Sequence, residues 1–156
     1  MLFNAVLAVL MLPGVVAFVI PLAMLRPVNR LRPFTPAGIV VLVLGSTIVA
    51  WCVRDFLVSG KGTLAPWAPP QHLVRCGLYR YSRNPMYIGV LLIVSGWALG
   101  FHSVALGEYA LLLAVGFHLR VVFGEEPWLA RIHGATWEAY RTVVPRWLTV
   151  HYRRHL

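Results

Sequence analysis

The stretch from Met86 to Phe123, "MYIGVLLIVSGWALGFHSVALGEYALLLAVGFHLRVVF", decides the fold. It contains two apolar runs, 86–101 and 104–123, each close to the length that an α-helix needs to cross about 30 Å of hydrocarbon. The connection between the runs, from Gly100 to Ser103, leaves room only for a tight turn. The sequence therefore predicts an antiparallel pair of membrane helices at this place.

Two more apolar runs precede this pair, at about 2–25 and 37–58. Of the 156 residues, 59% are apolar and 12% are charged, an apolar excess that a water-soluble domain of this length rarely carries. The first run lacks the basic region and the cleavage site of a signal peptide, so we expect it to be retained. The prediction is an all-α, polytopic transmembrane helical bundle of about four spans, with residues 1–156 forming a single domain.

The composition changes after Phe123, in the segment "GEEPWLARIHGATWEAYRTVVPRW" (124–147). Apolar and aromatic residues are spaced here among charged ones in a pattern typical of an amphipathic helix. They are Trp128, Leu129, Ile132, Tyr140, Val143 and Val144. Pro127 suits the first turn of this helix, and Pro145 should end it. We expect the helix to lie along the cytoplasmic membrane face or over the cytoplasmic ends of the bundle.

The basic residues orient the bundle. The net charge of +9 comes from 14 Lys and Arg against 5 Asp and Glu, and most basic residues fall in the 59–85 loop and the C-terminal tail. Because cytoplasmic segments retain Lys and Arg, we expect both termini inside, in a bacterial-type inner membrane. The basic tail lacks a folded nucleic-acid motif, so membrane lipids, and no nucleic acid, are the expected partners.

Several classes of site are not expected. Cys52 and Cys76 belong to no Cys-x-x-Cys or Cys/His ligand spacing, so the sequence predicts neither a disulfide framework nor a metal site. It also lacks a P-loop, a Gly-x-Gly-x-x-Gly fingerprint and a Gly-x-Ser-x-Gly motif. Any cofactor must therefore be held by helices and loops at the membrane face.

The polar candidate residues lie near the start of the run 86–101 and near the end of the run 104–123, on the predicted cytoplasmic side. The stretch 62–89 offers hydrogen-bond donors and aromatic faces, which also commonly anchor membrane helices: Gln71, His72, Tyr79, Arg80, Arg83, Asn84 and Tyr87. Glu125 and Glu126 can be helix N-terminal charges or can hold a cationic group. Arg120 can reach lipid headgroups or can meet a substrate carboxylate.

Two separated blocks carry a family resemblance. "LVRCGLYRYSRNPMYIG" (73–89) and "EEPWLARIHGATWEAYRTVVPRW" (125–147) together resemble the isoprenylcysteine carboxyl methyltransferase family and its phospholipid methyltransferase relatives. The resemblance implies a helical membrane enzyme that binds S-adenosylmethionine at the cytoplasmic face, through segments 62–89 and 120–147. Carried over by position, it assigns cofactor contacts to Gln71, His72, Leu73, Val74, Tyr79, Asn84, Pro85, Met86, Tyr87 and Glu125.

The resemblance also bears on the methyl acceptor. In the prenylcysteine enzymes an arginine about four residues before the first Glu is associated with the substrate carboxylate, whereas this chain has Val121 there and Arg120 beside it. We assign Arg120 and Glu126 to substrate positioning. A carboxylate is ionised at neutral pH and needs no general base, whereas an ammonium must first lose a proton, a task for which Glu126 or His72 is available. The sequence prediction is O-methylation of a lipid-like or isoprenylcysteine-like carboxylate, with phospholipid N-methylation as the alternative.

Two other functions stay open from the sequence. A sterol-type membrane reductase has a broadly similar helical plan but holds NADPH, a larger cofactor that would need more polar loop surface. A non-enzymatic membrane scaffold would use its tyrosines and arginines only as anchors.

Overall fold

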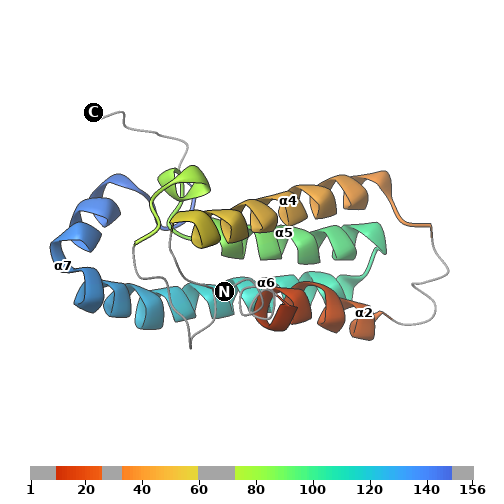
Figure 1. Ribbon diagram of the computed structural model, residues 1–156. Helices are drawn as coiled ribbons and strands as arrows, with labels where there is room; N and C mark the ends of the chain where they lie inside the picture. The colour runs from red at the N-terminus through yellow and green to blue at the C-terminus, as the bar shows by residue number, and fades with distance from the viewer. Residues whose placement is uncertain (1–9, 26–32, 60–72, 149–156) are drawn as a thin grey trace.

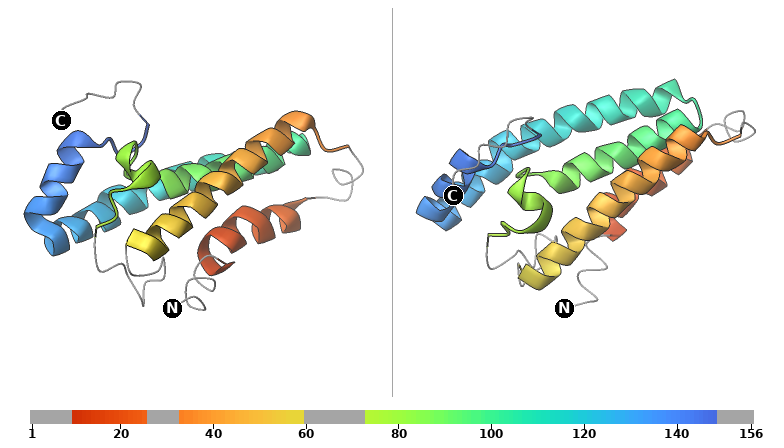
Figure 2. Two further views of the ribbon diagram at one scale, coloured as in Figure 1. Left: turned by 45° about the horizontal axis from the view of Figure 1, so that its top comes forward. Right: turned by 90° about the horizontal axis from the view of Figure 1, so that it is seen from above.

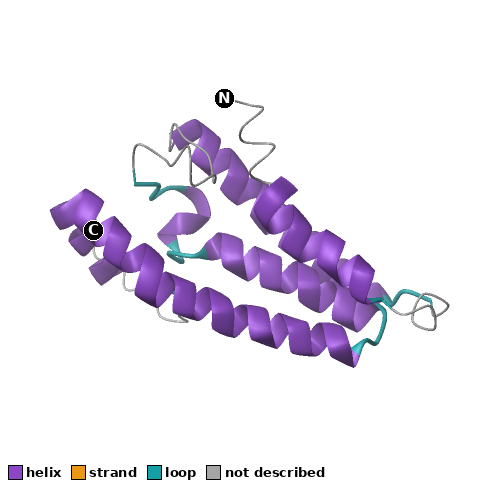
Figure 3. Ribbon diagram, turned by 90° about the horizontal axis from the view of Figure 1, so that it is seen from below, coloured by secondary structure: helices purple, strands orange, loops and turns teal. Residues whose placement is uncertain are grey.

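The computed structural model describes residues 10–25, 33–59 and 73–148. In these ranges every regular element is helical, and the long helices lie side by side (Figures 1 and 3). The elements are η1 (Leu10–Val19), α2 (Ile20–Met24), α4 (Pro36–Ser59), η2 (Gly77–Arg80), α5 (Pro85–Gly100), α6 (Val104–Arg120), η3 (Val121–Glu125) and α7 (Glu126–Val143). The all-α prediction is confirmed for the described part of the chain.

Helices α4 and α5 approach closely because glycines line their contact. A Cβ atom at Gly45 would lie 2.7 Å from the carbonyl oxygen of Gly89, and one at Gly96 would lie 2.7 Å from the backbone nitrogen of Leu42. Neither position has space for a side chain. Small residues allow membrane helices to pack backbone against backbone, which adds dispersion contacts that lipid cannot replace.

Helices α5 and α6 form the predicted antiparallel hairpin. Ser103 is the N-cap of α6, and its hydroxyl accepts a hydrogen bond from the backbone nitrogen of Leu106 at 3.4 Å. The outer side of α6 carries Leu111 and Leu112, which are 67% and 71% exposed. An apolar face of this kind is costly in water and is accommodated by hydrocarbon.

The count of membrane spans is only partly settled by helix length. Two of the described helices are long and apolar enough to cross a bilayer: Pro36–Ser59 and the continuous helix Val104–Val143, whose apolar part is α6. Pro13–Met24 and Pro85–Gly100 are apolar but shorter. The predicted runs 37–58 and 86–101 agree with α4 and α5 to within one residue at each end. Four spans and cytoplasmic termini stay predictions.

The N-terminal helix is held by side chains from the hairpin. Pro21 has no N–H to donate to the carbonyl groups one turn before it. The indole Nε1 of Trp97 donates instead to the carbonyl of Ala17 at 3.0 Å, and the hydroxyl of Tyr109 donates to the carbonyl of Val16 at 3.1 Å. Backbone groups that lack a partner in hydrocarbon are costly, so α5 and α6 stabilise the helix interrupted at Pro21.

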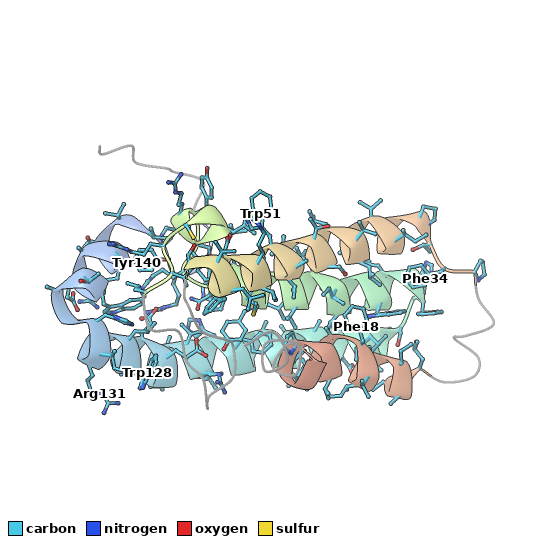
Figure 4. All side chains as sticks on the ribbon, viewed as in Figure 1. Phe18, Phe34, Trp51, Trp128, Arg131 and Tyr140 are labelled. Atoms are coloured by element: carbon cyan, nitrogen blue, oxygen red, sulfur yellow. The ribbon has the colours of Figure 1, made fainter. Side chains whose placement is uncertain are left out.

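An aromatic cluster closes the bundle at the end opposite to α7. The ring of Phe34 packs edge-on against Trp97 at 5.8 Å and against Phe101 at 4.8 Å. The backbone nitrogen of Thr35 donates to the carbonyl of Gly100 at 3.1 Å. Figure 4 shows Phe34 and Phe18 at this end, well away from Tyr140. The polar residues that could carry chemistry lie at the other end.

Helix α7 changes direction at Gly134, whose φ of 46° and ψ of −122° lie outside the helical region. The change lets the second half of α7 turn across the end of the bundle toward η2 (Figure 2). Trp137 and Tyr140 are buried there, while Trp128 and Ile132 of the first half stay exposed. The residues of the predicted apolar face therefore point in different directions in the two halves of α7. The position of α7 on a membrane surface stays a prediction.

Candidate functional site

The candidate site lies where α4 ends, α5 begins and α6 passes through η3 into α7 (Figure 1). Both sequence blocks that carry the family resemblance meet at this end. The hydroxyl of Tyr140 in α7 donates to the carbonyl of Tyr79 in η2 at 2.7 Å, in a buried position. The contact joins two segments that are 61 residues apart in the chain.

Tyr87, Arg120 and Glu125 form one hydrogen-bonded cluster. The hydroxyl of Tyr87 donates to Oε1 of Glu125. The Nε of Arg120 donates to the same carboxylate oxygen at 2.9 Å and to the Tyr87 oxygen at 3.1 Å. The ring of Tyr87 stacks on Phe117 with 4.4 Å between centroids, which fixes its hydroxyl toward α6. The predicted cofactor residues Tyr87 and Glu125 and the predicted substrate residue Arg120 are thus in direct contact.

A π-helical turn makes this cluster possible. Glu125 is five positions after Arg120, and in an α-helix that spacing turns the two side chains about 140° apart. In η3 each turn is wider, so a spacing of five returns to nearly the same face. Val121, at the position where the related enzymes have arginine, is 1% exposed and points into the bundle. Arg120, one residue earlier, is the side chain that contacts Tyr87 and Glu125.

Glu126 is held by two arginines. Its carboxylate accepts from Nε and Nη2 of Arg146 at 2.7 and 2.9 Å, and its Oε1 lies 3.0 Å from Nη1 of Arg83. The side chains of Glu126 and Arg83 are 14% and 11% exposed. Both carboxylate oxygens are engaged, an arrangement that favours an anchoring role for Glu126 over the predicted contact with substrate.

The electrostatics of this anchor follow from its burial. Burial alone would raise the pKa of Glu126, but the hydrogen bonds from Arg146 and the charge of Arg83 outweigh it and hold the pKa below the ordinary value. Burial lowers the pKa of Arg83, against the opposing effect of Glu126, while the hydrogen bonds to Glu126 raise the pKa of Arg146. All three groups are charged at neutral pH.

The chain after α7 is tied to the loop before α5, a contact that we call the C-terminal tie. The backbone nitrogen of Arg83 donates to the carbonyl of Pro145 at 2.9 Å. The side-chain amide of Asn84 donates to the carbonyl of Arg146 at 3.0 Å, and the hydroxyl of Ser82 donates to the same oxygen at 3.3 Å. Asn84 therefore does not cap α5 with its side chain, and the first-turn N–H groups of α5 have no side-chain cap.

The remaining predicted cofactor residues divide into two groups. Val74, Tyr79 and Met86 pack around Cys52 of α4 in a largely buried apolar cluster, which we call the apolar wall. Leu73 instead packs against the buried cluster that contains Trp137 and Tyr140. Pro85 is buried in the first turn of α5. Gln71 and His72 lie outside the described residues.

Sequence reasoning missed the structural importance of Arg83 and Arg146. Both stand inside the two sequence blocks, directly before Asn84 and directly after Pro145. Their charges were interpreted only as donors or as signals of membrane topology. Their pairing with a single carboxylate from the start of α7 could have been suspected, because buried charges need partners. Nothing in the local spacing indicates which carboxylate it is.

No group of three or more His, Cys, Asp or Glu side chains among the described residues is placed to hold a metal ion. Cys52 and Cys76 are both free thiols. Glu125 and Glu126 are instead paired with arginines, beside the apolar and aromatic residues that pack around Cys52. A site of that kind can enclose an organic cofactor and orient a charged acceptor, tasks that depend on positioning.

The comparisons with known proteins agree with this arrangement. The family model for phospholipid methyltransferase matches residues 34–136, more than half of the chain. No curated protein and no solved structure matches the chain. The matched range runs from the start of α4 into the second half of α7 and includes Tyr87, Arg120 and both glutamates of the site. The chain therefore belongs to the phospholipid methyltransferase family and is a membrane methyltransferase.

Proposed function

We propose that this enzyme transfers the methyl group of S-adenosylmethionine to a carboxylate of a lipid-like acceptor at the membrane face. The observation that carries the proposal is the contact of Arg120 with Tyr87 and Glu125 at the point where the apolar part of α6 ends. This cluster joins a residue suited to an anionic acceptor to two residues suited to the cofactor.

The residues present fit the cofactor. The apolar wall of Val74, Tyr79 and Met86 can enclose the adenine ring, and the uncapped first turn of α5 can accept the carboxylate of the methionine moiety. Glu125 can accept hydrogen bonds from ribose hydroxyls. When bound, the cofactor supplies a methyl group already activated on a sulfonium, so the protein needs to position the acceptor and exclude water.

Arg120 is suited to an anionic acceptor. Its side chain is 56% exposed, and its Nε is committed to Glu125 and Tyr87. That contact restrains the plane of the guanidinium group. Two Nη groups offer the fork of donors that binds a carboxylate in a bidentate manner. An acceptor tail can then lie along the exposed apolar surface of α6.

The charges at the site favour a carboxylate over an ammonium acceptor. An ammonium must lose a proton before it attacks, which requires a basic group with a free lone pair. Glu126 is engaged by two arginines and its pKa is lowered, so it is a poor base. Glu125 is engaged by Arg120 and Tyr87. A carboxylate acceptor needs no such group, because it is already ionised.

Phospholipid N-methylation is the second candidate, and the description of the matched family favours it. It would require a proton acceptor, either Glu125 released from Arg120 or His72, which lies outside the described residues. An NADPH-dependent reductase and a non-enzymatic scaffold have no comparable observation in their favour.

One experiment tests the proposal and separates the two acceptors. Purified protein is incubated with methyl-labelled S-adenosylmethionine and a total lipid extract, and the labelled lipid is treated with mild alkali. A methyl ester releases labelled methanol, whereas an N-methyl group stays on the lipid. We expect alkali-labile label, and alkali-stable label would replace the proposal with N-methylation.

Variants and a cofactor titration complete the test. We expect Tyr87→Ala and Glu125→Ala to reduce the affinity for S-adenosylhomocysteine at least tenfold, in calorimetric titrations of folded protein. Glu138→Ala is the matched control, because Glu138 is an exposed carboxylate of α7 that pairs with Arg141 at 2.6 Å. A well-folded wild-type protein that binds neither S-adenosylmethionine nor its demethylated product would contradict the proposal, and binding of NADPH instead would favour the reductase.

A further inference from the structure

Asp55 is a buried carboxylate without a matched partner. It lies in the last turns of α4, is 5% exposed, and its Oδ2 has no hydrogen-bond partner among the described residues. Within the described ranges its ion pair is with the neighbouring Arg54, at 3.7 Å, and the Arg54 side chain is 71% exposed. A long contact to a solvent-exposed side chain contributes little. A buried carboxylate in this condition is costly to the folded protein.

The other described carboxylates at this end are neutralised. Glu125 pairs with Arg120, and Glu126 pairs with Arg83 and Arg146. Asp55 differs from both glutamates, because the cation that the described residues offer its carboxylate is the exposed Arg54 at 3.7 Å, a contact that balances little of the charge. A bound group with a full positive charge would balance it.

Asp55 adjoins the apolar wall that is suited to the cofactor. Cys52, around which Val74, Tyr79 and Met86 pack, lies one helical turn before Asp55 on the same helix. Figure 4 shows Trp51, also on α4, beside the η2 ribbon at this end of the molecule. The carboxylate thus lies at the edge of the wall.

The η2 turn has a glycine, Gly77, beside Asp55, and only a glycine leaves room for the carboxylate. Gly77 has a φ of +56°, which disfavours other residues, and a Cβ atom at this position would overlap with Oδ2 of Asp55. The backbone of η2 therefore approaches the carboxylate closely. It supplies no hydrogen bond to Oδ2, so the close approach leaves the charge unbalanced.

We propose that Asp55 binds the α-ammonium group of S-adenosylmethionine, as a cofactor residue in addition to those suggested by the family resemblance. The inference rests on the proposed function and sharpens it, because it assigns different polar groups of the cofactor to two different carboxylates. The cationic ammonium goes to the unpaired Asp55, and the neutral ribose hydroxyls go to Glu125, whose charge Arg120 already balances. An ammonium also supplies up to three donors, enough to satisfy Oδ2.

The test is a two-by-two cycle of protein and ligand. S-adenosylhomocysteine and its deaminated analogue, which keeps the thioether and the carboxylate but lacks the ammonium, are each titrated into wild-type protein and into Asp55→Asn. We expect Asp55→Asn to lower the affinity of the protein for S-adenosylhomocysteine by roughly 10- to 100-fold, because a charge-assisted hydrogen bond is lost. The deaminated analogue should bind both proteins within about twofold of each other. Glu138→Gln, which removes an exposed carboxylate of α7, should leave all affinities unchanged.

The melting temperature of the ligand-free protein gives a second test of the role of Asp55. Because Asp55 carries an unbalanced buried charge, Asp55→Asn without ligand should melt no lower than wild type, whereas loss of a purely structural contact would lower the melting temperature. Equal affinity of wild type and Asp55→Asn for S-adenosylhomocysteine, or an equal loss for both ligands, would overturn the inference while leaving the proposed function standing. A wild-type protein that binds neither ligand would overturn both. If Asp55→Asn fails to fold, the wild-type comparison decides: equal affinity for the two ligands overturns the inference, and a tenfold or greater preference for S-adenosylhomocysteine supports it.

Discussion

Arg120 and Glu125 are five residues apart, yet Nε of Arg120 lies 2.9 Å from Oε1 of Glu125. The π-helical turn η3 produces this contact by widening the helix at the membrane border. The same turn brings Glu125 to the hydroxyl of Tyr87. One extra residue in a helix thus determines which side chains meet at the candidate site, as π-turns at functional sites often do.

The π-turn gives a prediction about chain length. Deletion of Gly124, at which a Cβ would contact nothing within 4 Å, reduces the spacing of Arg120 and Glu125 to that of one α-helical turn and should keep them on one face. Insertion of an alanine after Gly124 should instead rotate them apart by about 100° and lower methyl transfer at least tenfold. Methyl-transfer assays on both variants check this, and equal activity of the two would contradict it.

The anchor at Glu126 gives a prediction about stability. Glu126→Gln leaves Arg83, a guanidinium that is 11% exposed, without its carboxylate, and we expect a loss of about 3 kcal/mol. Glu138→Gln removes a carboxylate that is 50% exposed and should change stability by less than about 0.5 kcal/mol. Thermal melting in one detergent compares the two. Equal melting temperatures would show that Arg83 finds another partner.

The lowered pKa of Glu126 predicts an acid sensitivity. A carboxyl group whose pKa is lower in the folded state contributes stability above its unfolded value, about 4.3, and that contribution is lost as pH falls through the folded pKa. The difference in melting temperature between wild type and Glu126→Gln should therefore be constant near neutral pH and shrink below about pH 4. A difference that grows as the pH falls below about 4 would be inconsistent with the carboxylate as its source.

The bonds around Pro21 predict a rescue. Trp97→Phe removes the donor to the carbonyl of Ala17 and should cost about 1 to 3 kcal/mol, because that carbonyl lies in an apolar environment. Pro21→Ala restores a backbone N–H that can reach the same carbonyl. The double variant should recover most of the loss measured by melting. An additive loss would show that the indole stabilises the bundle through packing alone.

The glycine contact predicts a position-specific effect. Gly45→Ala places a methyl group 2.7 Å from the carbonyl oxygen of Gly89 and should lower the melting temperature by separating α4 from α5. Gly116→Ala on α6 meets nothing within 4 Å and should be neutral or stabilising by about 0.5 to 1 kcal/mol. Similar effects at both positions would argue against close packing of α4 on α5.

The helices could be predicted from the sequence because long apolar runs leave few alternatives in a membrane. The runs 37–58 and 86–101 agree with α4 and α5 to within one residue. The end of α6 was less predictable, since a π-turn leaves the apolar pattern unbroken through Phe123. The direction change at Gly134 was missed for a similar reason, because a glycine within a helical pattern does not reveal its own φ.

Residues of the candidate site could be predicted only where they belong to a local sequence motif. Tyr87 and Glu125 were found from two blocks of sequence, and the structure brings them into contact. Arg83 and Arg146 were missed as partners of Glu126, because long-range pairing of charges leaves no trace in local spacing. Asp55 was missed because α4 resembled the related enzymes only as an apolar run, and its burial depends on how η2 packs on it.

The C-terminal tie also sets an order of events during synthesis. The loop at 82–84 is translated long before the carbonyls of Pro145 and Arg146 that accept its hydrogen bonds. Until residues 145 and 146 leave the ribosome, Arg83 and the first turn of α5 lack the contacts that hold them. A nascent chain that ends before Pro145 would insert its helices without assembling the site, so the site forms only after residues 145 and 146 have been made.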